Sequence, residues 1–325
     1  MSEACHWSKQ SEKASGRELK FVLFLFRIFP VVILRILAFP VGFVYFLISG
    51  KARHESKRFM QRIAQFIDDP KLAKKCRHSF APLRHIISFS LTLVEKIQGW
   101  GGKFPFKNIH FQNDDVNDLI NELNNGKGAF LIFSHLGNLE LLRSLLNSGN
   151  TGVSRIVPAT AIMDINVTSH FVKTLKEINP QSEVDIIGAD EIGPQTALLL
   201  EDRLANGGVV LIAGDRTSAS GSGNALLPFF GKEAPFPSGV FYLLSLLNYP
   251  RYFVFGLRSR CLSIKAQYNM YVHKSDISFE CSRNERKQRS NILAQVFVSL
   301  LEGYCKKYPF QWYNFFDFWH EGEAK

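Results

Sequence analysis

The chain has 325 residues, of which 46% are hydrophobic, enough for one sizeable core with at most a small appendage. Its formal net charge of +10 favours an anionic partner, which can be nucleic acid, an anionic membrane face or an acidic protein. The five cysteines are odd in number and contain no CxxC pair, which argues against a disulfide framework or a zinc site and fits a reducing compartment better.

The most apolar part of the chain is residues 21–49, FVLFLFRIFPVVILRILAFPVGFVYFLIS. It is long enough to cross a bilayer, which takes roughly 20 residues. Arg27 and Arg35 interrupt it, and Pro30 and Pro40 break or kink a helix. The block begins late, runs long and is followed by no small-residue cleavage site, so it does not resemble a signal peptide.

Basic residues flank this block on both sides, and positive charge marks the cytoplasmic side of a membrane. The pattern therefore predicts a kinked helical segment that dips into one leaflet, with Arg27 and Arg35 reaching back to the headgroups. The alternative is a helical pair buried in the core. The sequence favours a division into an N-terminal membrane-associated helical region, 1–60, and an α/β domain, 61–325.

The chain between residues 52 and 100 has helical periodicity with a break at Pro70. From about residue 115, helix-like and strand-like runs alternate. Helices are expected at 116–126, 139–149, 169–178, 194–207, 238–248 and 284–306. Strands are expected at 128–134, 155–159, 184–189, 208–214, 252–258 and 262–272.

This alternation predicts an α/β fold with a mainly parallel central sheet flanked by helices. Several strand runs are continuously apolar, as in strands covered on both faces. Functional sites in such sheets lie beyond the carboxyl ends of the strands. His135 follows one apolar strand, and Asp215 and Arg216 follow another, so all three are expected at that edge.

The stretch FSHLGNLELL, 133–142, places His135 five residues before Glu140. Within one continuous helix these side chains would point about 140° apart. If His135 instead lies in the turn before the helix, with Asn138 near the N-cap, Glu140 falls in the first turn and can reach back to the imidazole. Gly137 permits the tight turn. On these residues alone, a capping carboxylate at a helix start is the commoner interpretation.

A His–Glu dyad would have a clear chemical use. Neutral imidazole takes a proton from a hydroxyl or amine, while the carboxylate fixes the tautomer and stabilises the imidazolium. Ser134 is next to His135, but no GxSxG nucleophile elbow surrounds it.

Five separated stretches, in this order, resemble the lysophospholipid acyltransferase superfamily, whose hallmark is H-x4-D/E. They are HW near the start with ARHESKRFMQRI, FSHLGNLELL, DIIGADEIGPQTALLLEDRLANGGVVLIAGDRT, LPFFGKEAPFPSGVFYLLSLLNYP and YPFQWYNFFDFW. The chain looks like the bacterial lipid A late-acyltransferase family. It looks closer still to the predicted acyltransferase branch found with aryl-polyene or flexirubin-type lipids. The resemblance covers essentially the whole chain.

The resemblance implies an acyltransferase that carries a fatty acyl group from a thioester to a hydroxyl or amine of a lipid or glycolipid. His135 would be the general base and Glu140 its orienting partner, and no acyl-enzyme is expected. The family also implies a place on the cytoplasmic face of the bacterial inner membrane. Acyl carrier protein or acyl-CoA would be the donor, and either fits the basic charge. No cofactor is implied.

Further site candidates follow from the same blocks. The tetrahedral intermediate needs an oxyanion donor, for which the backbone near Gly137 or the Arg216 side chain are the candidates. Substrate or oxyanion candidates are Gly137, Asn138, Asp215, Arg216 and Lys232, and acyl-chain pocket candidates are Phe229, Phe230 and Phe236. A packed turn followed by a helix explains the FFGKEAPFPSG block equally well.

Three observations bear on the alternatives. The family places an arginine at the end of the strand after the H-x4-E helix, but here Arg155 stands at its start, so a lipid A acceptor is in doubt. An intact His135 and Glu140 argue against a non-catalytic, membrane-anchored lipid-binding or assembly factor. The basic run at 282–289 has neither a phosphate loop nor an RNP-like strand beside it, and no HExxH or HxH motif is present, so neither nucleic-acid binding nor a metal site is expected.

Overall fold

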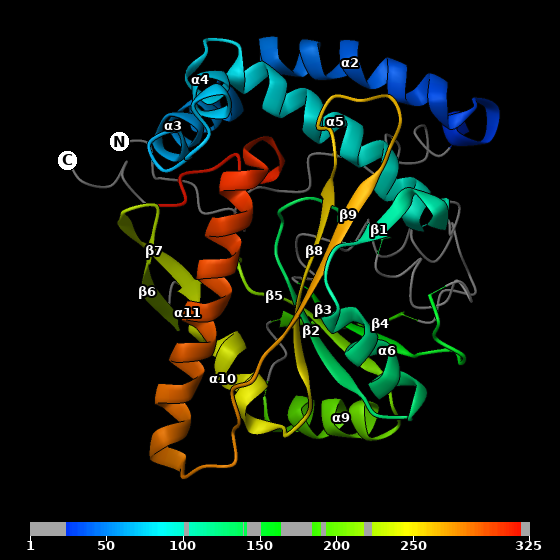
Figure 1. Cartoon of the computed structure of the whole chain (residues 1–325), viewed down its shortest axis with the longest axis vertical. Coiled ribbons are helices and arrows are strands. Elements are labelled where there is room, and N and C mark those ends of the chain that lie inside the picture. The colour runs from blue at the N-terminus through cyan, green and yellow to red at the C-terminus, as the bar shows by residue number, and fades with distance from the viewer. Residues whose placement is uncertain are drawn as a thin grey trace.

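The computed structural model describes residues 24–100, 104–138, 140–141, 151–163, 184–189, 193–217 and 223–319. Within them the chain is α/β, with a seven-stranded, mostly parallel sheet flanked by helices and an apolar helix near the N-terminus (Figure 1). The helices are α2 (Val31–Ile48), α3 (Gly50–Ile63), α4 (Pro70–Arg77), α5 (Ala81–Trp100), α6 (Asp115–Asn124), α9 (Pro194–Ala205), α10 (Ser238–Leu246) and α11 (Arg283–Lys307).

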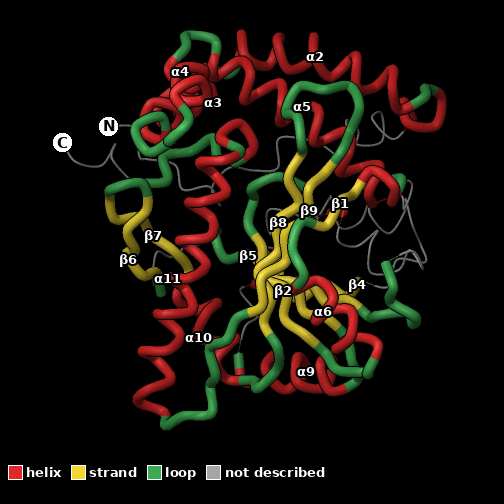
Figure 2. The backbone as a smooth tube through the Cα atoms, viewed as in Figure 1, coloured by secondary structure: helices red, strands yellow, loops and turns green. Residues whose placement is uncertain are grey.

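The large sheet has the order β1-β9-β8-β2-β5-β3-β4, and a separate hairpin pairs β6 with β7 (Figure 2). The strands are β1 (Ile109–Phe111), β2 (Ala129–Phe133), β3 (Ala159–Met163), β4 (Val184–Gly188), β5 (Val209–Ala213), β6 (Asn224–Phe229), β7 (Lys232–Pro237), β8 (Arg251–Arg258) and β9 (Tyr268–Lys274). The five strands from β8 to β4 are parallel, and β9 pairs antiparallel with β8. The expected mainly parallel sheet is confirmed.

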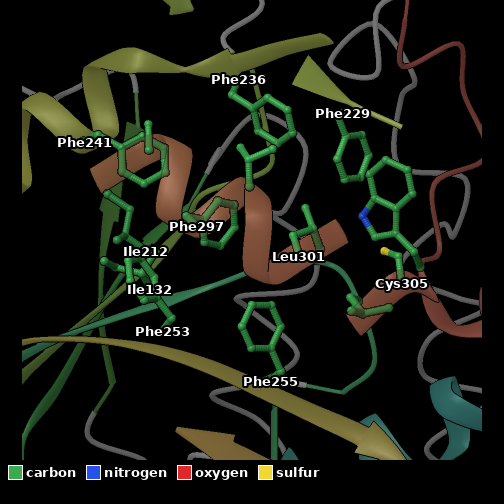
Figure 3. Close-up of a cluster of buried hydrophobic side chains, with 14 of the residues drawn as sticks. Ile132, Ile212, Phe229, Phe236, Phe241, Phe253, Phe255, Phe297, Leu301 and Cys305 are labelled. Atoms are coloured by element: carbon green, nitrogen blue, oxygen red, sulfur yellow. The ribbon is translucent and has the colours of Figure 1, made fainter. Parts of the chain in front are cut away.

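Alternate residues of the central strands build two cores, because successive side chains point to opposite faces. Phe130 and Ile132 of β2 face the core that α9, α10 and α11 cover. Ala129 and Leu131 face the core that α6 covers. In the first core Phe297 of α11 lies among Phe241, Phe253 and Phe255, as Figure 3 shows. Burial on both faces explains why these strands are continuously apolar.

Two strands begin later in the chain than predicted, because arginine side chains bind carbonyl oxygens of the loops before them. The strand expected at 155–159 begins only at Ala159, because Arg155 donates to the carbonyl oxygens of Leu123 and Gly207 and holds the approach as a loop. The strand expected at 262–272 begins at Tyr268, because the Arg258 guanidinium binds carbonyl oxygens of the preceding loop.

The helical region expected over 52–100, with a break at Pro70, comprises α3, α4 and α5. Pro70 is the first residue of α4, where Asp69 caps the helix by accepting from the Lys71 N–H at 2.9 Å. The proposed boundary at residue 60 falls inside α3. The hairpin β6–β7 and the short strand β1 are additions to the predicted elements. Most of the helix expected at 139–149, and the helix expected at 169–178, lie outside the described residues.

The apolar helix α2 packs along α5 on one face and exposes apolar side chains on the other (Figure 1). By length and composition it can cross a membrane, and in the described part of the chain it is the only such helix. Gly42 allows the close packing, since a Cβ there would lie 2.9 Å from Ser90 Oγ. The expectation that Arg35 reaches membrane headgroups is wrong. Its side chain is buried, with one guanidinium nitrogen 3.3 Å from Glu95 and another donating to Gln98 at 2.8 Å.

Candidate functional site

The parallel pairing of β2 with β5 brings His135 and Asp215 together. Phe133 lies opposite Ala213 in the register, so the residues two positions further on emerge side by side at the carboxyl edge of the sheet. His135 Nδ1 lies 2.9 Å from Asp215 Oδ1, and the His135 backbone N–H donates to Asp215 Oδ2 at 2.8 Å. This edge faces α5, and α2 lies on the other side of α5 (Figure 1).

The turn after β2 is fixed by contact with β8. Gly137 has a φ of 80°, and a Cβ there would lie 2.1 Å from the Gly256 carbonyl oxygen, so only glycine fits. The Gly137 N–H donates to the Gln311 carbonyl oxygen and the Asn138 N–H donates to the Gly256 carbonyl oxygen, each at 2.8 Å. Both N–H groups are used within the protein. This argues against the backbone near Gly137 as the oxyanion donor and leaves Arg216 as the stronger candidate.

Asp215 accepts three hydrogen bonds in a buried position. Besides the two from His135, Trp312 Nε1–H donates to Oδ2 at 3.2 Å. Burial alone would raise the pKa of this carboxyl, but the charge and hydrogen bonds of His135, with help from Arg216, lower its pKa to about 2. Asp215 is therefore a carboxylate at neutral pH.

The Asp215 carboxylate selects the tautomer of His135. Nδ1 lies 2.9 Å from Asp215 Oδ1 and 3.2 Å from Arg216 Nε, and it can serve only one of them at a time. Donation to the carboxylate is the shorter, charge-assisted bond, so we assign the hydrogen to Nδ1. Nε2 then carries the lone pair and makes no hydrogen bond to any described residue.

His135 is set up as a neutral base. Burial and the neighbouring Arg216 cation lower its pKa, while Asp215 opposes that shift. The ring is not sealed in, because 36% of the side chain is accessible. An accessible, unprotonated Nε2 beside a fixed carboxylate is the arrangement that general-base catalysis needs.

The prediction that Glu140 pairs with His135 is wrong. Oε1 of Glu140 accepts a hydrogen bond from Lys96 Nζ of α5 at 2.7 Å, and the carboxylate next to the imidazole is Asp215. Oε2 of Glu140 is buried and has no hydrogen-bond partner among the described residues. Lys96 also lowers the pKa of His135, so its charge reaches the site. Lys96 could not be identified from the sequence, because a lysine within an amphipathic helix has no distinctive spacing.

The C-terminal segment after α11 holds the site from the outside. Trp312 binds Asp215, and its carbonyl oxygen lies 2.9 Å from Nε2 of the buried His85 on α5. The side chain of Gln311 bonds both the N–H and the carbonyl oxygen of Arg258, which ties this segment to the end of β8. The tryptophan belongs to the YPFQWYNFFDFW block, whose composition alone does not indicate a contact with the strand ends.

The remaining candidates divide between core, turn and surface. Phe229 and Phe236 are fully buried in the aromatic core and fill it (Figure 3). Phe230 lies in the β6–β7 turn with a φ of 50° and lines a neighbouring cleft. Lys232 is exposed at the start of β7. Asn138 is buried, and its amide N–H faces the Tyr268 hydroxyl at 3.4 Å. The structure thus brings His135, Asp215 and Arg216 together and leaves the phenylalanines and Lys232 apart from them.

The described residues contain no group of three or more His, Cys, Asp or Glu placed to hold a metal ion. No family model matches the chain, and no curated protein matches it.

Proposed function

We propose that this protein is a membrane-associated acyltransferase. It transfers a fatty acyl group from a thioester of acyl carrier protein or CoA to a hydroxyl or amine of a lipid or glycolipid. The observation that carries the proposal is the His135–Asp215 pair at the carboxyl edge of the sheet, with Nε2 accessible. The resemblance of five ordered sequence blocks to acyltransferases supports the same reaction.

The chemistry follows from the neutral imidazole. His135 Nε2 takes the proton of the acceptor hydroxyl or amine as its oxygen or nitrogen attacks the thioester carbonyl carbon. The Asp215 carboxylate stabilises the imidazolium that forms. When the tetrahedral intermediate collapses, the C–S bond breaks and the imidazolium returns the proton to the leaving thiolate. No covalent acyl-enzyme is needed.

Arg216 is the proposed oxyanion partner. Its Nε lies 3.2 Å from His135 Nδ1, and its guanidinium lies 5.1 Å from the centre of the Phe316 ring. A cation beside the reacting carbonyl stabilises the negative charge that develops on its oxygen. Lys96, held by Glu140, is a second cation that can face the phosphates of either donor.

The membrane role rests on α2. Its outward face carries exposed apolar side chains, including Ile36, Leu37, Val44, Leu47 and Ile48. Its inward face is joined to α5 by the buried Arg35–Glu95 contact. A helix held along its length against the protein fits a position in one leaflet, with the +10 chain on the cytoplasmic face of the bacterial inner membrane. Among the described elements, α5 lies between α2 and the site (Figure 1). Packed helices lie roughly 8–10 Å apart, so the acceptor's leaflet would be about one helix away from the site.

The test is an acyl-transfer reaction with purified wild type and His135→Ala in liposomes. Acyl-carrier-protein and CoA thioesters are supplied with a total bacterial lipid extract, and mass spectrometry identifies the products. We expect one lipid to gain a single acyl mass with wild type, and His135→Ala to lose this activity by roughly 10²–10⁴-fold. His110→Ala, on the exposed side of β1, is the matched histidine control and keeps full activity.

Two results contradict the proposal. Equal acylation by wild type and His135→Ala removes the base from the mechanism. Lipid binding without any product from either thioester instead supports a membrane-anchored lipid-binding or assembly factor.

A further inference from the structure

The short helix α4, with the sequence PKLAKKCR, carries four cations and no acid in its eight residues. Arg77 donates to the Ala64 carbonyl oxygen at 3.0 Å. The other three cations, Lys71, Lys74 and Lys75, are exposed, and none of them pairs with a carboxylate in the described part of the chain. Three positive charges on this helix are therefore free to meet an anionic partner.

The three lysines share one face of α4. Successive residues of a helix are turned by about 100°, so Lys71, Lys74 and Lys75 fall within an arc of about 100°. Ala73 and Cys76 lie on the opposite side of the helix and are buried. The lysines therefore point away from the protein as a group, and they form one continuous basic surface.

An exposed aromatic side chain follows this basic helix. Phe80 lies in the turn between α4 and α5 and is 62% exposed. Its ring centre lies 5.6 Å from that of His78, which is also exposed, and neither core cluster of the described residues includes it. An aromatic ring beside cations suits the interface of an anionic bilayer, where the ring enters the headgroup layer and the cations contact phosphates.

The packing of α2 on α5 places this turn near the C-terminal end of α2. Arg35 of α2 donates to Gln98 of α5, whereas Gly42, two turns further along α2, packs against Ser90. The two helices are therefore antiparallel, and α2 ends near the start of α5, which directly follows Phe80. In Figure 1, α4 and the turn after it lie along the same edge of the molecule as α2.

The C-terminal end of α2 combines apolar and basic groups in the same way. Leu47 and Ile48 are exposed, and the exposed Lys51 follows them at the start of α3. Arg53 donates to the carbonyl oxygens of Phe46 and Leu47 at 2.7 and 3.1 Å, so a cation satisfies carbonyl groups in the last turn of the apolar helix. The exposed apolar face of α2 thus ends at a basic border.

We propose that α4 and Phe80 form a docking surface for anionic phospholipid that continues the apolar face of α2. Phe80 enters the headgroup layer, and Lys71, Lys74 and Lys75 contact lipid phosphates. The inference rests on the membrane association in the proposed function and adds to it a selection for anionic lipid. The exposed ring and the adjoining apolar helix favour a bilayer over an acidic protein as the partner of these lysines.

The test is a competition between two kinds of vesicle for the full chain, made by cell-free synthesis. Phosphatidylcholine vesicles and vesicles that also contain phosphatidylglycerol are present in equal amounts and are separated by density. We expect wild type to favour the anionic vesicles. The triple variant Lys71→Gln, Lys74→Gln, Lys75→Gln should lower the ratio of anionic to neutral binding by about fivefold per lysine, or roughly 100-fold in all.

The matched control removes the same charge elsewhere, with Lys127→Gln, Arg283→Gln and Lys287→Gln. These positions follow α6 and begin α11, at the end of the molecule away from α2 (Figure 1). Charges far beyond the screening length of about 8 Å contribute little at a membrane surface, so the control should keep the wild-type ratio.

Phe80→Trp tests the insertion directly. On anionic vesicles its added fluorescence should be quenched by lipids that are brominated near the headgroup end of their chains. Tyr242→Trp, at an exposed aromatic position on α10, is the matched control and should escape this quenching. Equal quenching of the two added tryptophans, or none at Phe80→Trp, would contradict insertion of the turn.

The outcomes separate this inference from the proposed function. His135→Ala should bind vesicles as wild type does even when acyl transfer is lost. If wild type binds neither kind of vesicle, the membrane association fails and the inference fails with it. If wild type binds vesicles and the triple lysine variant keeps the wild-type ratio, only the inference is overturned. A raised KM for acyl carrier protein in that variant, with an unchanged vesicle ratio, would assign the lysines to an acidic protein instead.

Discussion

Two buried charge clusters lie at the same end of the sheet, and they differ in how completely they are satisfied. At the end of β8, Arg258 forms a two-pronged contact with Glu95 at 2.8 and 2.9 Å, and Tyr268 also donates to that carboxylate. Arg35 lies 3.3 Å from the same group. At the ends of β2 and β5, Asp215 is equally buried and hydrogen-bonded, but its partner His135 keeps one ring nitrogen accessible.

This difference separates structural from chemical use of charge. In the Glu95–Arg258 cluster, both carboxylate oxygens of Glu95 and all three guanidinium nitrogens of Arg258 have hydrogen-bond partners, so neither side chain has an atom left to meet a ligand. Arg35 Nε is buried next to Glu95 and makes no hydrogen bond to a described residue. In the His135–Asp215 pair the carboxylate is saturated and the imidazole is not. A saturated buried pair specifies how elements pack, whereas a half-satisfied pair at a strand end is suited to exchange protons with a substrate.

The largest expected effect is a loss of activity on substitution in the His135–Asp215 pair. Asp215→Asn removes the charge that selects the tautomer of His135, and transfer should fall by roughly 10²–10⁴-fold. The free energy of unfolding should fall by only about 1–2 kcal/mol, because the amide oxygen still accepts one hydrogen bond. The measurements are acyl-transfer rates and urea unfolding in detergent. A variant that keeps wild-type activity would show that Asp215 belongs with the structural cluster.

The next largest effect is a loss of stability on substitution in the Glu95–Arg258 cluster. Glu95→Gln leaves Arg258 and Arg35 buried without a counter-charge, and the free energy of unfolding should fall by about 3–5 kcal/mol. Urea unfolding measures this loss, with Asp118→Asn as the control. Asp118 is exposed and lies 3.7 Å from Lys274, so its replacement should cost less than about 0.5 kcal/mol. Equal losses in the two variants would contradict a structural role for the buried cluster.

The third effect is on the pH dependence of stability and involves His85. Burial lowers the pKa of this histidine to about 3, and it sits between Ser56 Oγ and the Trp312 carbonyl oxygen. Below about pH 6.5 this histidine is protonated in the unfolded chain but stays neutral in the folded chain. Its contribution to the free energy of unfolding is therefore fully present above pH 6.5 and is lost as the pH falls toward 3.

At pH 5 the loss from this one group is about 2 kcal/mol, since each pH unit below 6.5 costs about 1.4 kcal/mol. His85→Gln should therefore shrink the stability difference between pH 7.5 and pH 5 by that amount, measured by urea unfolding at both pH values. His54→Gln, on the exposed surface of α3, serves as the comparison and should leave the difference unchanged. An unchanged difference in His85→Gln would mean that the histidine is already charged in the folded protein.

The sequence predicted what depends on local pattern. The apolar strands at β2 and β5 are recognisable because both their faces are covered, and their parallel arrangement places His135 and Asp215 at one edge. Neither strand's sequence shows that β2 pairs with β5, which is what makes the two residues neighbours. The prediction of Glu140 as the partner of His135 came from the resemblance to acyltransferases with an H-x4-D/E motif, whereas the observed partner lies 80 residues away across a strand pairing.

The contacts that escaped prediction are those made by ordinary residues at long range. Lys96 and Trp312 approach the site from α5 and from the C-terminal segment, and neither belongs to a spaced motif. Arg35 was predicted to face the membrane because it interrupts an apolar run. The structure instead pairs it with a carboxylate on α5, which the apolar run itself does not reveal.

The smallest expected effect tests whether the C-terminal segment changes the pKa of His135 or only packs against the His135–Asp215 pair. Trp312→Phe removes one hydrogen bond to Asp215 and should cost about 1–2 kcal/mol of stability. With one donor fewer, the carboxylate holds the imidazolium more strongly, so the pKa of His135 should rise and the acid limb of the kcat/KM profile should move to higher pH. Trp319→Phe is the matched control, because its indole N–H also donates at 3.2 Å, but to the carbonyl oxygen of Phe229. A shift of the kcat/KM profile in Trp312→Phe alone would identify a positioning role for Trp312. Equal profiles in the two variants would mean that both tryptophans contribute only packing.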